Sequence, residues 1–219
     1  MKNLGILFLS LALAINASAQ NEKYIKAMQT NVTAFDTTRS VAGLHALANS
    51  FERIATAEKN QWLPYYYAAL AQVNKGYNMM GGNMGGNAAE IDPIADKAEA
   101  LINQAEALSQ NNSEIYIVKK MIHSLRFMVD PQTRYMQYGP KAQEALDMAK
   151  KLNPENPRVY LLEGQDKFYT PEQFGGSKEE AKKLFELAMQ KFESFKPHTA
   201  LEPAWGKGTT QYFILQAGK

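Results

Sequence analysis

Apolar side chains recur every three or four positions along most of the chain, which is the spacing of one face of an α-helix. One stripe begins at Tyr24, a second at Val41 and a third at Ile94. No segment alternates apolar and polar residues as a half-buried strand does, and no tight hairpin signal separates the apolar segments. The pattern therefore predicts an all-α protein of eight or nine helices.

Several residues mark where these helices begin. Asp92-Pro93 has the form of an N-cap followed by a first-turn proline. Ser177 and Glu180 form a capping box, and Pro64 and Pro157 each stand near an expected helix start. These signals divide the apolar stripes into separate helices of ordinary length.

A spacing of small, large and small residues repeats along the chain. It occurs at Ala98, Ile102 and Ala105, and again at Ala142, Leu146 and Ala149, and at Ala181, Phe185 and Ala188. Small residues one or two turns apart let two helices approach closely, and the large residue fills the space beside them. Each helix pair then leaves an apolar face that only the next pair covers, so the units are expected to stack as a solenoid.

This spacing resembles that of the tetratricopeptide repeat family over roughly residues 40 to 195. The three matching units are Tyr65, Ala69, Ala98, Ile102 and Ala105; Tyr116, Ala142, Leu146, Ala149 and Pro154; and Tyr160, Gly164, Ala181, Phe185 and Ala188. The second unit departs from the family because Lys120 stands where a small residue is expected. The resemblance implies a superhelix of about three helical hairpins, with an N-terminal helix pair and a C-terminal capping segment.

The turn inside each unit is longer than in that family. The three turns are expected at residues 78–87, 130–140 and 170–177, all on one edge of the solenoid, where binding loops accumulate. Gly175-Gly176 is similar to a variant repeat found in periplasmic helper subunits of solute transporters. The first turn contains Met79, Met80 and Met84, which could bind Cu(I), form an adaptable apolar contact or simply pack on neighbouring helices.

The resemblance also implies a concave inner face. Its positions are Tyr66, Leu70, Ile117, Met121, Leu161 and Gln165. Such an apolar groove is a liability when it is open to water, so either an external segment or the chain itself should cover it. Because terminal repeats need a cap, we favour the apolar cluster from Tyr212 to Leu215 as that cover.

Candidate catalytic and metal chemistry is sparse. The chain has no cysteine, and its histidines, at positions 45, 123 and 198, are far apart along the sequence. No Gly-x-Ser-x-Gly elbow or phosphate-binding loop is present. We therefore expect no enzyme activity, no cofactor and no metal site. The formal net charge of +2 gives no reason to expect nucleic acid as a partner.

The N-terminus has the features of a secretory signal peptide. Lys2 precedes an apolar run from Leu4 to Ile15, and small residues at Ala17 and Ala19 fit a cleavage site. The run is shorter than the about 20 residues that span a bilayer. We expect cleavage near Ala19 and a single helical domain at residues 20–219. The mature protein would be soluble and periplasmic or secreted, without insertion into the membrane.

Two functions fit these features. The first is a binding scaffold that holds a protein or peptide partner in the inner groove. The alternative is a periplasmic carrier of a small ligand, or a transporter accessory protein, with a pocket roofed by the long turns.

Overall fold

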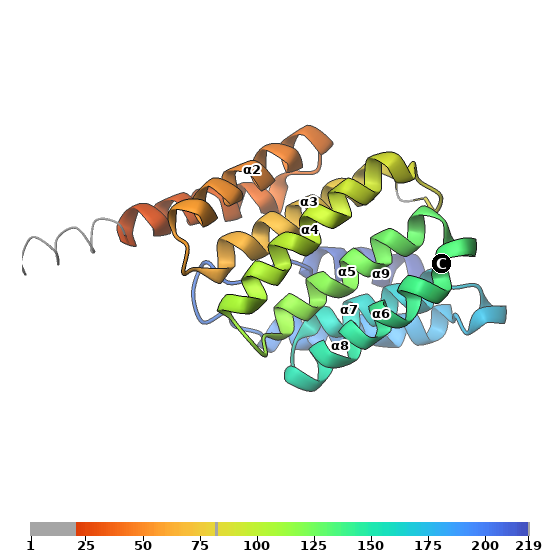
Figure 1. The fold of residues 1–219 in the computed structure, drawn as a ribbon. Coiled ribbons are helices and arrows are strands. Elements are labelled where there is room, and N and C mark those ends of the chain that lie inside the picture. Colours follow the sequence, from red (N-terminus) through yellow and green to blue (C-terminus); the bar gives the residue numbers. More distant parts are fainter. Residues whose placement is uncertain (1–20, 82, 219) are drawn as a thin grey trace, which may run out of the picture.

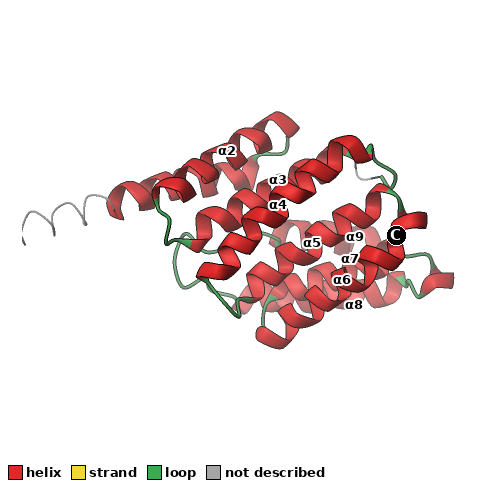
Figure 2. Ribbon diagram, viewed as in Figure 1, coloured by secondary structure: helices red, strands yellow, loops and turns green. Residues whose placement is uncertain are grey.

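A computed structural model describes residues 21–81 and 83–218, which form nine α-helices, one short 3-10 helix and no strand (Figures 1 and 2). The predicted signal peptide, residues 1–19, lies outside these described residues. The helices are residues 21–37, α2 (Val41–Ala57), α3 (Trp62–Met79), α4 (Ala88–Leu108), α5 (Ser113–Val129), α6 (Pro131–Leu152), α7 (Pro157–Tyr169), η1 (Glu172–Phe174), α8 (Lys178–Ser194) and α9 (Lys207–Ala217). The all-α prediction is confirmed.

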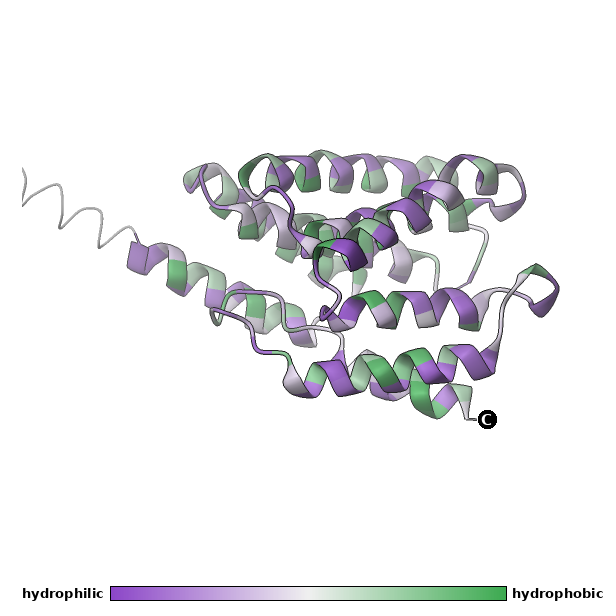
Figure 3. Ribbon diagram, turned by 90° about the horizontal axis from the view of Figure 1, so that it is seen from below, coloured by the Kyte–Doolittle hydropathy of each residue, from purple (hydrophilic) through white to green (hydrophobic). Residues whose placement is uncertain are grey.

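Helices that follow one another in the sequence pack together. The extensive contacts within α3–α4, α5–α6 and α7–α8 define three hairpins, and α4 joins the second hairpin through α5. Hydrophobic and hydrophilic residues both recur along each helix, as expected when one face packs against the protein and the other contacts solvent (Figure 3). Helix α9 contacts α8 and α7 in the way that α5 contacts α4 and α3, so α9 takes the place of the first helix of a further hairpin.

The small–large–small spacing lies in the core, as predicted. Ala181, Phe185 and Ala188 are fully buried on α8. A Cβ atom at Gly164 on α7 would lie 2.6 Å from the Phe185 ring, closer than carbon atoms can approach without movement. The absence of a side chain at this position therefore allows α7 and α8 to pack closely.

Lys120, which departs from the small-residue pattern, has a structural role of its own. Its side chain is only 5% exposed, and its Nζ atom lies 2.6 Å from Oδ1 of Asp166. This ion pair connects α5 to α7, two helices of the inner layer. The charged end of the lysine therefore links the two helices.

Two boundary predictions are wrong. Residues 131–140 are not a turn but the first part of α6, because Asp130 caps the helix by accepting from the amide of Thr133 and Pro131 occupies the first turn. Helix α4 begins at Ala88 with Asn87 as its cap, which places Pro93 inside the helix. In both cases an Asn or Asp farther upstream supplies the cap.

The other two turns are present. The described residues between α3 and α4 are 80, 81 and 83–87, so Asn78 and Met79 of the predicted turn belong to α3. The amides of Gly85 and Gly86 donate to the carbonyls of Met128 and Val129 at 2.8 and 3.1 Å. This turn is therefore tied to the end of α5. The turn between α7 and α8 contains η1.

The C-terminal cluster caps the last hairpin. Phe213 is buried and stacks on Phe185 with ring centroids 5.1 Å apart, whereas Tyr212 and Leu215 are exposed. The segment before α9, drawn in blue in Figure 1, runs back toward the N-terminal half of the protein. That segment, rather than Tyr212 to Leu215, reaches the inner helices near Tyr66 and Tyr67.

Candidate functional site

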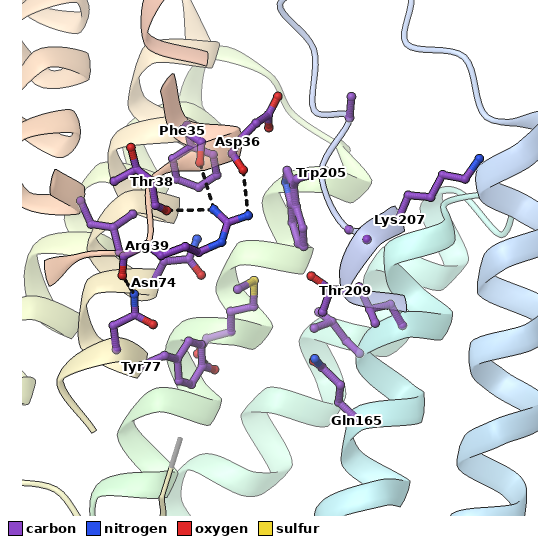
Figure 4. A pocket seen from close by; sticks show the side chains of 18 residues that line it. Phe35, Asp36, Thr38, Arg39, Asn74, Tyr77, Gln165, Trp205, Lys207 and Thr209 are labelled. Carbon is purple, nitrogen blue, oxygen red and sulfur yellow. Dashed lines mark hydrogen bonds between the residues drawn. The ribbon is translucent and has the colours of Figure 1, made fainter. Parts of the chain in front are cut away.

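A cavity of about 510 Å³ lies on the inner side of the helical stack (Figure 4). Its volume is within the range of about 300–1,000 Å³ that is typical of small-ligand sites. We call this space the inner-face cavity. The helices α3, α5 and α7 contribute to it, together with Leu44 of α2 and two segments outside the hairpins, residues 35–39 and 204–209.

Part of the lining is apolar. Met121 of α5 and Leu161 and Leu162 of α7 are buried side chains, and we call these three residues the floor. Phe35 and the half-buried Trp205 add aromatic surface from the two segments outside the hairpins. An apolar, partly aromatic lining of this kind suits a flat hydrophobic ligand.

The rim carries a net positive charge. Of the residues that line the cavity, Arg39 and Lys207 are cationic and Asp36 is the one acid. Neither cation forms a salt bridge with another described residue. Arg39 donates to the carbonyls of Asp36 and Thr38 at 2.7 and 2.9 Å, which holds its guanidinium at the end of the first described helix (Figure 4).

Helix α9 also begins at this rim. Lys207, Gly208 and Thr209 form its first turn and line the cavity, and no side chain caps them. The N-terminal end of a helix has a partial positive charge and unpaired amides. It adds to the positive potential of Lys207. Gly206, which precedes the helix, has a φ of 113°, a conformation that favours glycine.

Residues 201–206, which we call the strap, are held over the inner helices by hydrogen bonds. The Tyr67 hydroxyl donates to the Leu201 carbonyl at 3.0 Å, and Nε1 of Trp205 donates to the Tyr66 hydroxyl at 2.8 Å. Arg158 donates to the Pro203 carbonyl. The strap therefore covers Tyr66 and brings Trp205 to the cavity wall.

A buried ion pair lies beneath the strap. Arg158 is completely buried, and its Nη1 atom lies 2.9 Å from Oε1 of Glu114. Burial raises the pKa of Glu114 above its usual value, although Arg158, Tyr66 and Asn156 act in the opposite direction. The Arg158 guanidinium also lies 5.1 Å from the Trp205 ring, so the pair supports the strap from below.

The six predicted groove residues divide into two groups. Met121, Leu161 and Gln165 line the inner-face cavity. Tyr66, Leu70 and Ile117 are fully buried and are not among its lining residues. All six lie on α3, α5 and α7. We expected Tyr212 to Leu215 to cover the groove, whereas the strap covers Tyr66.

The methionines of the first turn also separate. Met80 is 7% exposed and packs near Gly86 and Ile91, whereas Met79 and Met84 are exposed. None of the three lines the inner-face cavity. This cavity is therefore bordered by the strap and residues 35–39. Of the described residues in the predicted turns at 78–87 and 170–177, Asn78 alone contributes to its lining.

The sequence interpretation did not single out Arg39, Trp205 and Lys207. Arg39 and Trp205 lie in connecting segments and Lys207 is the first residue of α9, so none of the three belongs to a helix of the three hairpins. The one available signal was a tryptophan followed by Gly206-Lys207-Gly208, within a stretch otherwise read as breaker-rich. Its position beside α3 and α7 depends on long-range contacts that no local pattern encodes.

Among the residues that the structure describes, no group of three or more His, Asp or Glu side chains is arranged to hold a metal ion. None of the three histidines lines the inner-face cavity. Within residues 21–81 and 83–218, no helix combines the length and apolar character needed to cross a bilayer.

The chain is similar to a solved structure, the HusA haemophore from Porphyromonas gingivalis. The two share 31% sequence identity with a TM-score of 0.78, and the match covers 89% of this chain and 92% of that one. No protein-family model matches the chain, and no curated protein does. Membership of the tetratricopeptide family is therefore not confirmed.

This similarity corrects the leading functional prediction. A haemophore is a binding protein for a small ligand, so the prediction of a protein-interaction scaffold in the groove is wrong. The similarity supports the alternative, a carrier of a small ligand, although the cavity described above lies under the strap rather than under the long turns.

Proposed function

Because the chain belongs to the same protein family as the HusA haemophore, we propose that it binds haem in the inner-face cavity. The observation that carries this proposal is the combination of an apolar floor with a cationic rim in one space. Haem is a flat apolar ring with two carboxylates on one edge, and the two parts of the cavity match these two parts of the ligand.

The apolar ring would lie against the floor and Trp205. Removal of apolar surface from water contributes about 25 cal/mol per Å², so a large flat ring gains most of its affinity in this way. The floor residues are already buried among packed helices, and little reorganisation is needed to form this contact.

The two carboxylates would lie at the rim. Arg39 and Lys207 have no competing salt bridge among the described residues, and the first turn of α9 adds unpaired amides. Exposed ion pairs contribute modestly and are screened by salt. Their main effect is therefore to orient the ring and to favour ligands that carry carboxylates.

We further propose that the protein acts outside the cytoplasm as a non-enzymatic carrier. The support is the signal-like sequence of residues 1–19, with cleavage near Ala19, which would leave residues 20–219 as one domain. The absence of catalytic motifs from the sequence is consistent with a protein that binds its ligand without converting it.

The test is a titration of the mature chain with haem, followed by absorption spectroscopy. We expect saturable binding of one haem, and about 5- to 30-fold weaker binding by the Arg39→Ala/Lys207→Ala double variant at low salt, from a loss of about 1–2 kcal/mol. Arg53→Ala/Lys59→Ala is the matched control because it removes the same charges from exposed positions outside the cavity. Equal haem affinity in both double variants would show that the rim charges do not contribute to haem binding. If the unmodified chain shows no saturable binding, the proposed function is wrong.

A further inference from the structure

Trp205 is the aromatic residue that the strap contributes to the inner-face cavity. Its ring is half-buried and lies across the cavity from Arg39 (Figure 4). Its Nε1 atom donates to the Tyr66 hydroxyl at 2.8 Å. This bond fixes one edge of the indole and leaves the plane of the ring free to tilt. Contacts with the faces of the ring therefore decide its orientation.

The guanidinium of Arg158 makes such a contact. Its central carbon lies over the Trp205 ring, 5.1 Å from the centroid. The rings of Phe195 and Phe192 lie 4.9 and 5.8 Å from the same carbon, so aromatic side chains surround the cation. A planar cation is attracted to the face of an aromatic ring, most strongly where water is excluded. Arg158 is completely buried, so water does not weaken its attraction to the indole.

The guanidinium is itself held on two sides. Its Nη1 atom lies 2.9 Å from Oε1 of Glu114 at the start of α5. Its Nη2 atom donates to the carbonyl of Pro203, two residues before Trp205 in the strap. A side chain fixed both to a packed helix and to the strap has little freedom to follow the indole. Arg158 is therefore placed to hold the ring of Trp205 in one orientation.

Stability of the hairpins alone does not account for an arginine at this position. Among the described residues, the buried Nε atom of Arg158 has no hydrogen-bond partner, and an unsatisfied buried donor lowers stability. Replacement of a buried ion pair by well-packed apolar residues is often neutral or stabilising. An apolar side chain would fill this volume, but it would neither donate to Pro203 nor attract the indole. The properties that only arginine supplies here are those directed at the strap.

We infer that Arg158 is a positioning residue for ligand binding, which holds the ring of Trp205 as a rigid wall of the inner-face cavity. This inference rests on the haem-binding function proposed above. Arg158 does not itself line the cavity, so it acts on the ligand through the indole. A wall that is already ordered loses less conformational entropy on binding than a mobile wall does, and the ligand is held for longer.

The main variant is Arg158→Lys. Lysine keeps a positive charge beside Glu114 but lacks the planar group that stacks on a ring. Arg126→Lys is the matched control. Arg126 is also buried and ion-paired, and its guanidinium lies 5.8 Å from the Tyr138 ring, but that ring is not part of the cavity.

The first measurement needs no ligand. Every protein carries Trp62→Phe, which leaves Trp205 as the one tryptophan, and circular dichroism confirms that each variant retains its helices. Fluorescence anisotropy then reports the motion of this ring on the nanosecond timescale. We expect the anisotropy to fall in Arg158→Lys and to stay unchanged in Arg126→Lys.

The second measurement is the rate of haem transfer to an acceptor protein. Haem should dissociate about three- to tenfold faster from Arg158→Lys, which corresponds to the loss of one buried contact between a cation and a ring. Arg126→Lys should not change the rate. In a Trp205→Leu background, Arg158→Lys should change the rate by less than about twofold, because the residue through which it acts is absent.

A second variant leaves the ion pair intact. Phe195→Leu removes a ring that packs against the guanidinium and lies outside the cavity lining. It should lower the anisotropy of Trp205 and accelerate haem dissociation, both by less than Arg158→Lys does. This variant also tests the inference if Arg158→Lys does not fold.

An anisotropy and a dissociation rate that are unchanged in both Arg158→Lys and Phe195→Leu would overturn the inference. Equal acceleration of dissociation by Arg158→Lys with and without the indole would also overturn it, because the effect would then come from general loosening of the strap. If the unmodified chain binds no haem, the proposed function is wrong. The anisotropy of the ligand-free variants still decides in that case whether Arg158 fixes the orientation of Trp205.

Discussion

The floor and the rim of the inner-face cavity are built in different ways. Met121, Leu161 and Leu162 of the floor belong to helices of the repeated hairpins, and many apolar neighbours hold them in place. The rim comes from residues 35–39 and 204–209, which lie outside the three hairpins. Specific hydrogen bonds hold these segments over the inner helices, together with the buried side chains of Phe35 and Leu201.

This difference suggests that the floor determines the shape of the cavity and that the rim determines how a ligand enters it. Closely packed helices tolerate little change in volume, so the floor sets the shape of the cavity. Part of the strap is accessible to solvent, since Ala204 is exposed and Trp205 and Gly206 are half-buried. Partly exposed connecting segments open at lower free-energy cost than packed helices do. We therefore expect ligand entry and release to occur through movement of the strap, with the hairpins unchanged. The following variants test this distinction, in order of decreasing expected effect.

The largest loss of stability is expected where the strap meets the helices of the hairpins. Arg158→Ala removes the buried guanidinium that connects α7, Glu114 and the strap. It leaves a buried carboxylate without its charged partner, and breaking a buried pair in this way costs about 3–5 kcal/mol. Chemical denaturation measures the loss. Arg53→Ala, an exposed arginine, should change stability by less than about 0.5 kcal/mol. Equal stability of the two variants would show that the strap does not depend on Arg158.

The next largest loss of stability is expected from a substitution inside the packed hairpins. Gly164→Ala places a Cβ atom 2.6 Å from the Phe185 ring, and overpacking of this kind costs about 1–3 kcal/mol. Gly208→Ala is the control, because no atom lies within 4 Å of its Cβ position at the exposed start of α9. That substitution should stabilise the protein by a few tenths of a kcal/mol, or about 1 kcal/mol at most. A neutral Gly164→Ala would mean that α7 and α8 can separate freely.

A smaller effect is expected on the rim. Trp205→Phe keeps an aromatic ring but removes the Nε1 hydrogen bond to Tyr66. The loss of one such bond costs about 1 kcal/mol. Haem should dissociate several-fold faster from the variant, while its helical content and the affinity of the floor for small apolar probes remain unchanged. Stopped-flow transfer of haem to an acceptor protein measures the rate. An unchanged rate would contradict the assignment of the strap as the route of release.

The smallest loss of stability is expected from the removal of an ion pair between α4 and α6, away from the cavity. Asp92 accepts from both terminal nitrogens of Arg134, at 2.7 and 2.9 Å, and this contact lowers the pKa of the carboxyl group. Its stabilisation is therefore present above the unfolded pKa and is lost as pH falls through the lower folded pKa. The pair is partly exposed, so we expect about 0.5 kcal/mol at neutral pH.

The measurement compares Asp92→Asn with the unmodified chain at neutral pH and in acid. The difference in unfolding free energy between the two proteins should be largest at neutral pH. It should disappear in acid, once the pH has fallen below the lowered pKa of the carboxyl group in the native protein. A difference that persists undiminished in strong acid would indicate a packing role for this side chain instead of a charge effect.

Much of the fold follows from local patterns. The apolar period locates the helices, and the spacing of Ala181, Phe185 and Ala188 identifies residues that are fully buried in the structure. The errors in the helix boundaries also came from local patterns. The start of α6 was placed about ten residues too late because Pro140 was taken as a boundary, although Asp130 and Pro131 begin the helix and Pro140 lies inside it.

The site was harder to predict. Three of the six groove residues, which the resemblance to the repeat family implied, line the cavity. The helical period indicates only which side chains share a face. The period contains no information about a segment that folds back from the far end of the chain. Tyr66 was therefore predicted to be a binding residue of the groove, whereas it is buried and accepts a hydrogen bond from Trp205, 139 positions away.

The sequence by itself determined the all-α class, the hairpin spacing and the apolar inner face, because these depend on residues within one or two helical turns of each other. Only the tertiary structure decided where the cavity lies and which charges border it. Arg39, Trp205 and Lys207 reach it through contacts between the two ends of the chain. Such contacts depend on the curvature of the whole stack of helices. The curvature results from many small packing angles between helices, and no single segment of the sequence specifies it.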